Sequence, residues 1–344
     1  MSRTRLISVT ILSRQLRFVP DFPESNLYYE VNGRPILTEN VEKKIVTLDE
    51  ILDLRLHNRS PSIDSLISVE DSEELVSLKN FLKNSFNADL YTNIDRDNMQ
   101  FIGPLEINLN VYYEVHVCVS EHESLKICAD TIEQRISSVW KDERSRRITA
   151  SNAHCLYTYY NSRHDTVKDW RRKISGMVYP RNIQSTAVSH GVRCEPLAIR
   201  AYERDYGKTV SMCGFVIPPH VPWLGCSPDG IIFNERRIVE VKCPMSGANY
   251  PLCEVLENVS YLTKKLKLLK RNHQYYTQVQ LNMFILKCTS ADFVIYSEMD
   301  DKCNVETIHF DENYVETILS SLKEIYFNAY LKFLFSFNFR NLTR

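Results

Sequence analysis

The chain has 344 residues, of which 44% are hydrophobic and 25% are charged, and its formal net charge at pH 7 is −1; this is enough material for one large domain with an appendage. No apolar run reaches the roughly 18 residues of a membrane-spanning helix, and arginines interrupt the first segment too early for a secretory signal, so we expect an intracellular protein of the nucleus or cytoplasm that binds no membrane. The 10 cysteines are scattered singly, which argues against disulfides and a zinc cluster and favours reduced thiols.

Residues 1–115 show no chemical motif and no internal repeat. They contain short β-type runs at residues 5–12 and 44–48, broken by Pro, Asn and Gly, and one amphipathic helix near residues 72–84. Acidic side chains dominate residues 64–100, with 8 Asp and Glu against 3 Lys and Arg. We assign residues 1–115 as an accessory region whose role the sequence does not give.

The pattern changes at about residue 116, where helical periodicity becomes regular. We predict helices at residues 124–144, from residue 151, and at residues 186–206, 273–287 and 314–333, and strands at residues 209–217, 231–233, 237–242, 292–297 and 305–310. This order is typical of an α/β (α+β) domain with a central mixed β-sheet flanked by helices, which we place at residues 116–344.

A basic stretch lies at residues 135–193, which hold 12 Lys and Arg against 4 Asp and Glu. A polyanion such as DNA would be attracted to this stretch and repelled by the acidic residues 64–100. The alternative is that both stretches are ordinary solvated surfaces.

The most informative segment is residues 223–244. Side chains two positions apart in a strand point to the same side, so Glu240 and Lys242 project together from the predicted strand. A polar turn joins this strand to the preceding one as a hairpin, which brings Asp229 beside Glu240. The alternatives are that Asp229 is only a turn residue, and that Glu240 and Lys242 are only an ion pair on a half-exposed strand.

Two carboxylates that converge at one strand end repel each other, and a divalent cation offsets this repulsion. Mg²⁺ suits the site, with Mn²⁺ as a substitute, because it binds through one or two carboxylates, water and substrate phosphate. We expect Lys242 to hold or deprotonate water, with its pKa lowered by the cation and by partial burial. The pattern therefore predicts metal-dependent hydrolysis of phosphodiester bonds.

The Pro-Asp and Glu-x-Lys arrangement resembles the signature of the PD-(D/E)XK nucleases. The wider pattern resembles the YqaJ viral recombinase family, to which bacteriophage lambda exonuclease is related. Four blocks carry the resemblance, in order: Trp140 with Arg144 and residues 147–151, residues 191–203, residues 225–244, and residues 275–280. The resemblance implies a restriction-endonuclease-like fold for the domain.

The resemblance also implies roles for single residues. It makes Asp229 and Glu240 metal ligands, adds the carboxylate of Glu195 from its helix, and completes the ligand shell with the peptide carbonyl of Val241. It makes Lys242 the catalytic lysine.

Three further residues receive roles from the same resemblance. Gln278 would help to position the lysine, the water or the phosphate, and the alternative is a surface residue of its helix. Arg144 falls where the family places a phosphate-binding arginine, and Ser151 follows it as a hydroxyl donor to phosphate. A guanidinium fork suits a terminal phosphate, although the alternative for Arg144 is an exposed basic turn.

The function implied is a Mg²⁺-dependent exonuclease that degrades one strand of linear duplex DNA from a 5′-phosphorylated end, in DNA recombination, repair or processing. The family further implies a ring-shaped homo-oligomer and a partner that anneals single strands. Two alternatives stay open: a catalytically idle DNA-binding or assembly module, and an endonuclease that uses the same site.

Overall fold

The computed structural model describes residues 72–88, 107–162, 169–180 and 185–342, together with short strands within residues 7–46. These strands are β1 (Ile7–Ser8), β2 (Ile11–Leu12), β3 (Gln15–Leu16), β4 (Tyr28–Val31), β5 (Arg34–Leu37) and β6 (Ile45–Val46), and they pair antiparallel as β1–β6, β2–β3 and β4–β5. Strands β1, β2 and β6 lie inside the predicted β-type runs at residues 5–12 and 44–48. The other positions of those two runs lie outside the described residues.

The chain divides into two compact units, one of residues 1–70 with 335–344, and one of residues 71–334. The second unit begins ahead of the predicted boundary at residue 115, because α2 (Glu73–Asn87) packs against α5 (Glu121–Asp130) and α11 (Gln274–Leu286). None of the described helices has the length and apolar character needed to cross a lipid bilayer.

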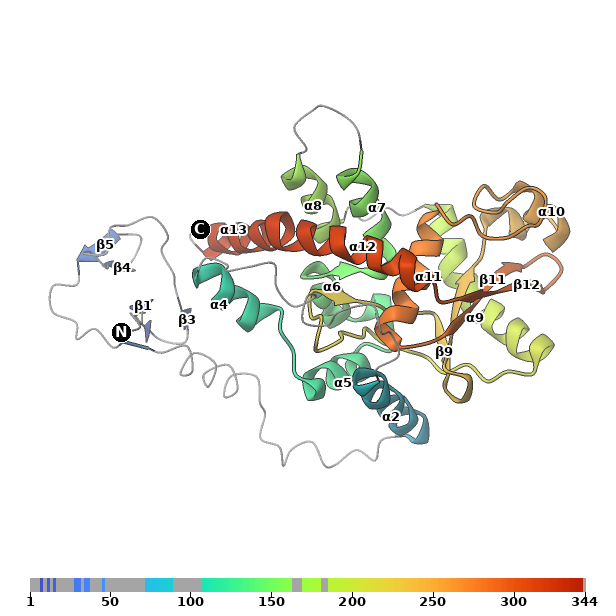
Figure 1. Ribbon diagram of the computed structural model, residues 1–344, viewed down its shortest axis with the longest axis horizontal. Helices are drawn as coiled ribbons and strands as arrows, with labels where there is room; N and C mark the ends of the chain where they lie inside the picture. Colours follow the sequence, from blue (N-terminus) through green and yellow to red (C-terminus); the bar gives the residue numbers. More distant parts are fainter. Residues whose placement is uncertain are drawn as a thin grey trace. The chain divides into compact units, whose positions relative to one another are not determined.

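The core of the second unit is a four-stranded sheet with the strand order β12-β11-β10-β9. Its strands are β9 (Gly230–Ile232), β10 (Arg237–Lys242), β11 (Ser290–Ser297) and β12 (Lys302–His309). Strand β10 runs parallel to β11, whereas the β9–β10 and β11–β12 pairs are antiparallel. The sheet is therefore mixed, and Figure 1 shows helices packed around it, which confirms the predicted α/β fold class.

The parallel pair requires a long crossover from the end of β10 to the start of β11. Two helices lie on this connection, α10 (Leu252–Asn258) and α11. Every residue of β11 is buried, as expected for an apolar, β-branched and aromatic central strand that is covered on both faces.

The chain contains further described helices. They are α4 (Ile107–His116), α6 (Ser138–Ser145), α7 (Ala150–Tyr160), α8 (Trp170–Val178), α9 (Thr186–Tyr206), α12 (Glu312–Ile325) and α13 (Leu331–Leu342), with the 3₁₀ turns η2 (Gln134–Ile136), η3 (Phe233–Glu235) and η4 (Met245–Ala248) and the π-helical turn η5 (Tyr326–Tyr330). Two short strands, β7 (Ile148–Thr149) and β8 (Leu224–Gly225), pair in parallel outside the main sheet.

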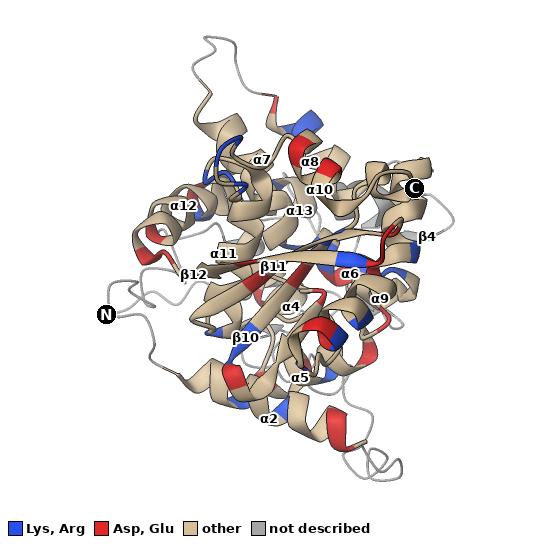
Figure 2. Cartoon of the chain, turned by 90° about the vertical axis from the view of Figure 1, so that its right-hand side faces the viewer, with Lys and Arg blue, Asp and Glu red and all other residues tan. Residues whose placement is uncertain are grey.

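Helices α9 and α11 cover opposite faces of β10. Val239 and Val241 pack against the α9 side chains of Cys194, Ala198, Ala201 and Tyr202. The alternate residue Glu240 points to the other face, where it meets α11. Figure 2 shows α9 and α11 on the two sides of β10 and β11. The Glu240 side chain of β10 is therefore buried between the sheet and α11.

Several predicted elements differ from the structure. The single helix expected at residues 124–144 is two helices, α5 and α6, separated by η2. The strand expected at residues 209–217 is limited to isolated bridges at Ser211 and Val216. The helix expected at residues 314–333 is interrupted by η5.

Candidate active site

A pocket of about 380 Å³ opens at the carboxyl end of β10. Every residue to which the sequence assigned a site role lines this pocket, although these residues come from α6, α7, α9, α11 and the β9–β10 hairpin. They are Arg144, Ser151, Glu195, Asp229, Glu240, Val241, Lys242 and Gln278.

The hairpin that should bring Asp229 to Glu240 is present. Strands β9 and β10 pair antiparallel from Ile232 opposite Arg237 to Gly230 opposite Val239. One step beyond this ladder, the Asp229 carboxylate accepts a hydrogen bond from the backbone N–H of Val241 at 2.7 Å. The side chain of Asp229 therefore takes the place of a backbone partner and is fixed at the end of the hairpin.

Glu240 is only 1% exposed and its two carboxylate oxygens are held by three donors. Oε1 accepts from Lys242 Nζ at 2.6 Å and from the Gln278 side-chain amide, and Oε2 accepts from Asn282 Nδ2 at 3.1 Å. Gln278 and Asn282 lie four residues apart, so both face the strand from α11. A buried carboxylate with this many donors is held in one orientation.

The three carboxyl groups of the pocket are costly to ionise together. Burial, followed by the charge of Asp229, raises the pKa of Glu240 to about 8 and that of Glu195 to about 7. Burial also raises the pKa of Asp229, against the opposing effect of the Lys242 ammonium. A positive charge bound among these groups would favour their ionised forms.

Opposing effects act on the pKa of Lys242. Burial alone favours the neutral amine, but the carboxylates of Glu240 and Asp229 outweigh it, so the pKa of Lys242 lies above its ordinary value. The sequence expectation of a lowered pKa applies to a site that holds a divalent cation, whose charge would oppose the effect of these carboxylates. The ammonium also lies 4.7 Å from the centre of the Tyr275 ring, a favourable cation–π position.

The donor set of Glu195, Asp229 and Glu240 fits a hard divalent cation, because it offers only oxygen ligands and its burial disfavours uncompensated negative charge. These carboxylates are more widely spaced than a second group, His190, Cys194 and Glu298, which alone among the described residues brings three ligand atoms within 4.8 Å of one another.

The second group is occupied by a cation of the chain itself. The guanidinium of Arg193 pairs with both oxygens of Glu298, and its Nη2 lies 3.4 Å from His190 Nδ1. The group is therefore already neutralised without a metal ion.

A basic subsite adjoins the acidic one. Arg144 Nη2 donates to Ser151 Oγ at 3.0 Å, and Nη1 donates to Ser227 Oγ at 3.4 Å. The guanidinium stacks 4.2 Å above the ring of Trp140, whose Nε1 also donates to Ser227. Two hydroxyl groups and a guanidinium fork thus converge on one point, a suitable set of donors for phosphate oxygens.

A model of the YqaJ-like viral recombinase domain matches residues 139–318, which is more than half of the chain. The chain belongs to the YqaJ-like viral recombinase family. No curated protein sequence matches it significantly.

Several crystal structures are similar to this family member. The alkaline exonuclease from Laribacter hongkongensis is 20% identical, with a TM-score of 0.45, and the match covers 60% of this chain and 98% of that chain. The phage-related exonuclease from Haemophilus somnus 129PT is 14% identical, with a TM-score of 0.38 and coverages of 56% and 96%. The shutoff and exonuclease protein from Kaposi's sarcoma-associated herpesvirus is 12% identical, with a TM-score of 0.39 and coverages of 80% and 97%.

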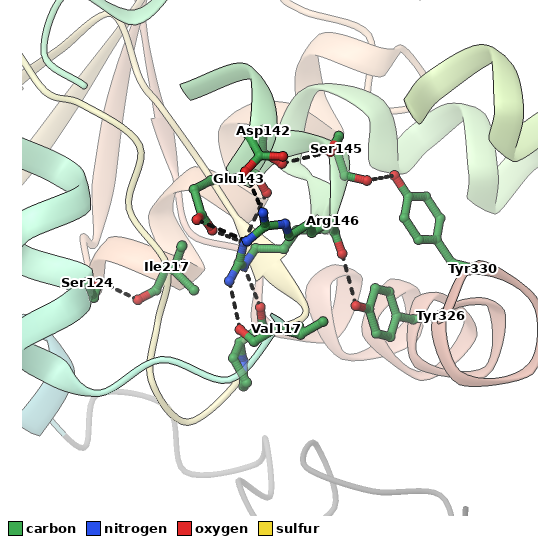
Figure 3. A network of polar contacts seen from close by, with 11 residues as sticks. Val117, Ser124, Asp142, Glu143, Ser145, Arg146, Ile217, Tyr326 and Tyr330 are labelled. Carbon is green, nitrogen blue, oxygen red and sulfur yellow. Dashed lines mark hydrogen bonds and ion pairs between the residues drawn. The ribbon is translucent and has the colours of Figure 1, made fainter. Parts of the chain in front are cut away.

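The YqaJ-like domain fixes the segment around Arg144 through its buried neighbour Arg147. The Arg147 guanidinium pairs with the Glu143 carboxylate and donates to the carbonyl oxygens of Val117 at 2.7 Å, Glu143 at 3.0 Å and Pro222 at 2.8 Å. From the other side, the hydroxyl groups of Tyr326 and Tyr330 donate to the carbonyl oxygens of Arg146 and Ser145 (Figure 3). The residues that follow Arg144 are therefore held by contacts to Val117 and Pro222 and to two tyrosines of η5.

The sequence did not identify three further residues that lie beside the predicted ones, namely Asn282, which donates to Glu240, and Ser227 and Arg135, which line the pocket. Asn282 could have been found as the residue one helical turn after Gln278, and Ser227 lies two residues before Asp229 in the segment already singled out. Arg135 also lines the pocket, but it comes from η2, where the sequence predicted continuous helix.

Proposed function

We propose that this chain is a Mg²⁺-dependent exonuclease that hydrolyses one strand of linear duplex DNA from a 5′-phosphorylated end. The observation that carries the proposal is one pocket with an acidic subsite, built from Glu195, Asp229 and Glu240 beside Lys242, and an adjoining basic subsite built around Arg144. Membership of the viral recombinase family supports the nuclease chemistry.

In this proposal, Glu195, Asp229, Glu240 and the carbonyl of Val241 hold the cation. A bound Mg²⁺ supplies Lewis-acid activation of water and neutralises charge on the scissile phosphate. The hydrogen bond from Val241 N fixes Asp229, so the acid needs little reorganisation before it can act as a ligand.

Lys242 and Gln278 act on the reacting groups. Both donate to Glu240 Oε1 from the pocket side, and each has further N–H donors to offer to water or phosphate. We assign Lys242 to orient the water and the scissile phosphate, and Gln278 to keep the lysine in place.

The basic subsite would hold the terminal 5′-phosphate. A phosphate there would replace the hydrogen bonds that Arg144 now makes to Ser151 and Ser227, and all three groups would donate to its oxygens. The bound terminal phosphate would place the adjacent phosphodiester bond in the acidic subsite, and this would explain a preference for DNA ends.

Incubation of the purified full chain with 5′-phosphorylated linear duplex and Mg²⁺ tests the proposal, with EDTA as control. We expect mononucleotide release that EDTA abolishes, no cleavage of circular duplex, and a loss of about 10²- to 10³-fold in rate for Lys242→Ala. DNA binding by this variant should persist. Lys265→Ala is the matched control, because Lys265 is an exposed lysine outside the pocket.

The other possible results point to the alternatives. Cleavage of the circular duplex would indicate an endonuclease. Binding without cleavage by the unaltered chain, and no effect of Lys242→Ala, would indicate an idle binding module and refute the proposal.

A further inference from the structure

The first residue of η2 is one of five non-glycine residues with positive φ in the described part of the chain, and among these five it alone lines the pocket. Gln134 has φ of +43°, a left-handed conformation that is unfavourable for a residue with a side chain. Its side-chain amide donates to the carbonyl oxygens of Cys213 at 2.9 Å and Pro228 at 3.1 Å. Pro228 directly precedes Asp229, so the strained turn is tied to the peptide that places this acid.

Strain of this kind persists where the surrounding contacts over-determine the backbone, and it occurs preferentially at functional sites. What this turn presents is Arg135, the next residue. Its side chain is exposed and lines the pocket together with Glu195, Asp229 and Arg144. Within the described part of the chain, the Arg135 guanidinium makes no hydrogen bond or ion pair.

Arg135 therefore shares one pocket with the acidic subsite and with the basic subsite of Arg144. Burial, followed by the charge of Arg135, lowers the pKa of Arg144 to about 10. Two guanidinium groups that face one pocket repel each other, and an anion bound between them removes that cost.

We propose that Arg135 is a further catalytic residue whose guanidinium contacts the scissile phosphate, between the carboxylates of the acidic subsite and the terminal-phosphate subsite of Arg144. The inference rests on the proposed function and adds to it. Charge that develops on the phosphate oxygens during hydrolysis would be stabilised by a donor already in position. The two hydrogen bonds of Gln134 provide that position.

The test compares Arg135→Gln, Arg135→Lys and Arg144→Gln with the unaltered chain on duplexes carrying a 5′-phosphate or a 5′-hydroxyl. Arg200→Gln is the matched control, because Arg200 is an exposed arginine that does not line the pocket. We expect Arg135→Gln to lower kcat by about 10²-fold while the preference for 5′-phosphate stays unchanged. Arg135→Lys should recover part of the loss, and Arg144→Gln should lose the preference.

Binding in EDTA gives a readout that does not depend on turnover. Removal of one phosphate contact should lower the slope of log K against log salt by about 1 in Arg135→Gln, and Arg200→Gln should leave it unchanged. Thermal unfolding serves as the control for folding: a variant with the same Tm as the unaltered chain is folded.

Three results would overturn the inference. The first is a kcat for Arg135→Gln within about 3-fold of that of the unaltered chain. The second is an unchanged salt slope for this variant. The third is a loss of 5′-phosphate preference equal to that of Arg144→Gln, which would make Arg135 part of the terminal-phosphate subsite. If the unaltered chain itself does not cleave DNA in Mg²⁺, it is the proposed function that fails.

Discussion

Replacement of Arg147 with methionine should destabilise the domain strongly. The Arg147 side chain is fully buried, and its loss leaves the buried Glu143 carboxylate without its main partner and three carbonyl oxygens without a donor. Breaking a buried ion pair on one side costs about 3–5 kcal/mol. Arg146 Nη1 remains 3.4 Å from Glu143, so we expect the lower end, about 3 kcal/mol, and a fall in Tm of roughly 6–10 °C.

A double-mutant cycle measured by urea and thermal unfolding checks this value. Glu143→Leu combined with Arg147→Met removes both charges and should be clearly more stable than Arg147→Met alone, because no buried charge is then left unpaired. Arg171→Met is the control, since Arg171 is exposed on α8 and a surface substitution should change the free energy of unfolding by less than about 0.5 kcal/mol.

The reasoning would be wrong if Arg147→Met changed the free energy of unfolding by less than about 1 kcal/mol. It would also be wrong if the double variant were as unstable as the single one. The first result would mean that water or a rearranged backbone satisfies the carbonyl groups. The second would mean that packing of the guanidinium, and not its charge, stabilises the segment around Arg144.

Two further predictions concern the pocket and its support. Because the pKa values of Glu195 and Glu240 are raised to about 7 and about 8, a cation that binds must displace protons. The Mg²⁺ affinity measured by calorimetry should therefore rise from pH 6 to about pH 9 and then level off. Glu240→Gln should weaken binding and flatten this rise, and an affinity independent of pH would contradict the assignment. A Cβ atom at Gly225 would lie 2.2 Å from the Phe215 ring, so Gly225→Ala should lower the free energy of unfolding by about 1–3 kcal/mol. A Cβ atom at Gly176 would meet no atom within 4 Å, so Gly176→Ala should leave the free energy of unfolding unchanged or raise it. Equal effects of the two substitutions would refute the packing argument.

The elements that were predicted correctly are those defined by local chemistry. Helix α9 begins after Ser185, whose side chain caps it, and ends at Gly207, which adopts the left-handed conformation with φ of 62°. Strand β10 has the predicted bounds because its alternating residues fit two covered faces. In both cases the signals lie within the element or next to it.

The elements that were predicted incorrectly depend on contacts between distant segments. The helix expected at residues 124–144 stops because Thr131 Oγ1 accepts from the backbone N–H of Phe215 at 2.7 Å, and Gln134 then bonds to Pro228. Both partners lie more than 80 residues further along the chain. Helical or strand periodicity describes only neighbouring residues, so it could not predict these contacts. The same limit explains why Arg135 was missed, since only the folded turn shows that it lines the pocket.

The contacts around Glu240 bear on the two roles that the sequence left open for Lys242, which are to hold water and to deprotonate it. Lys242 Nζ donates to Glu240 Oε1, a proposed metal ligand, so the amine is held beside the place where we propose that the cation binds. One N–H of this ammonium is taken by Glu240 Oε1, and the ring of Tyr275 lies beside the group, so two donors stay available toward the pocket. A fixed ammonium with two donors is suited to orienting water and stabilising charge on phosphate oxygens, and we propose this orienting role for Lys242 on the basis of its contacts.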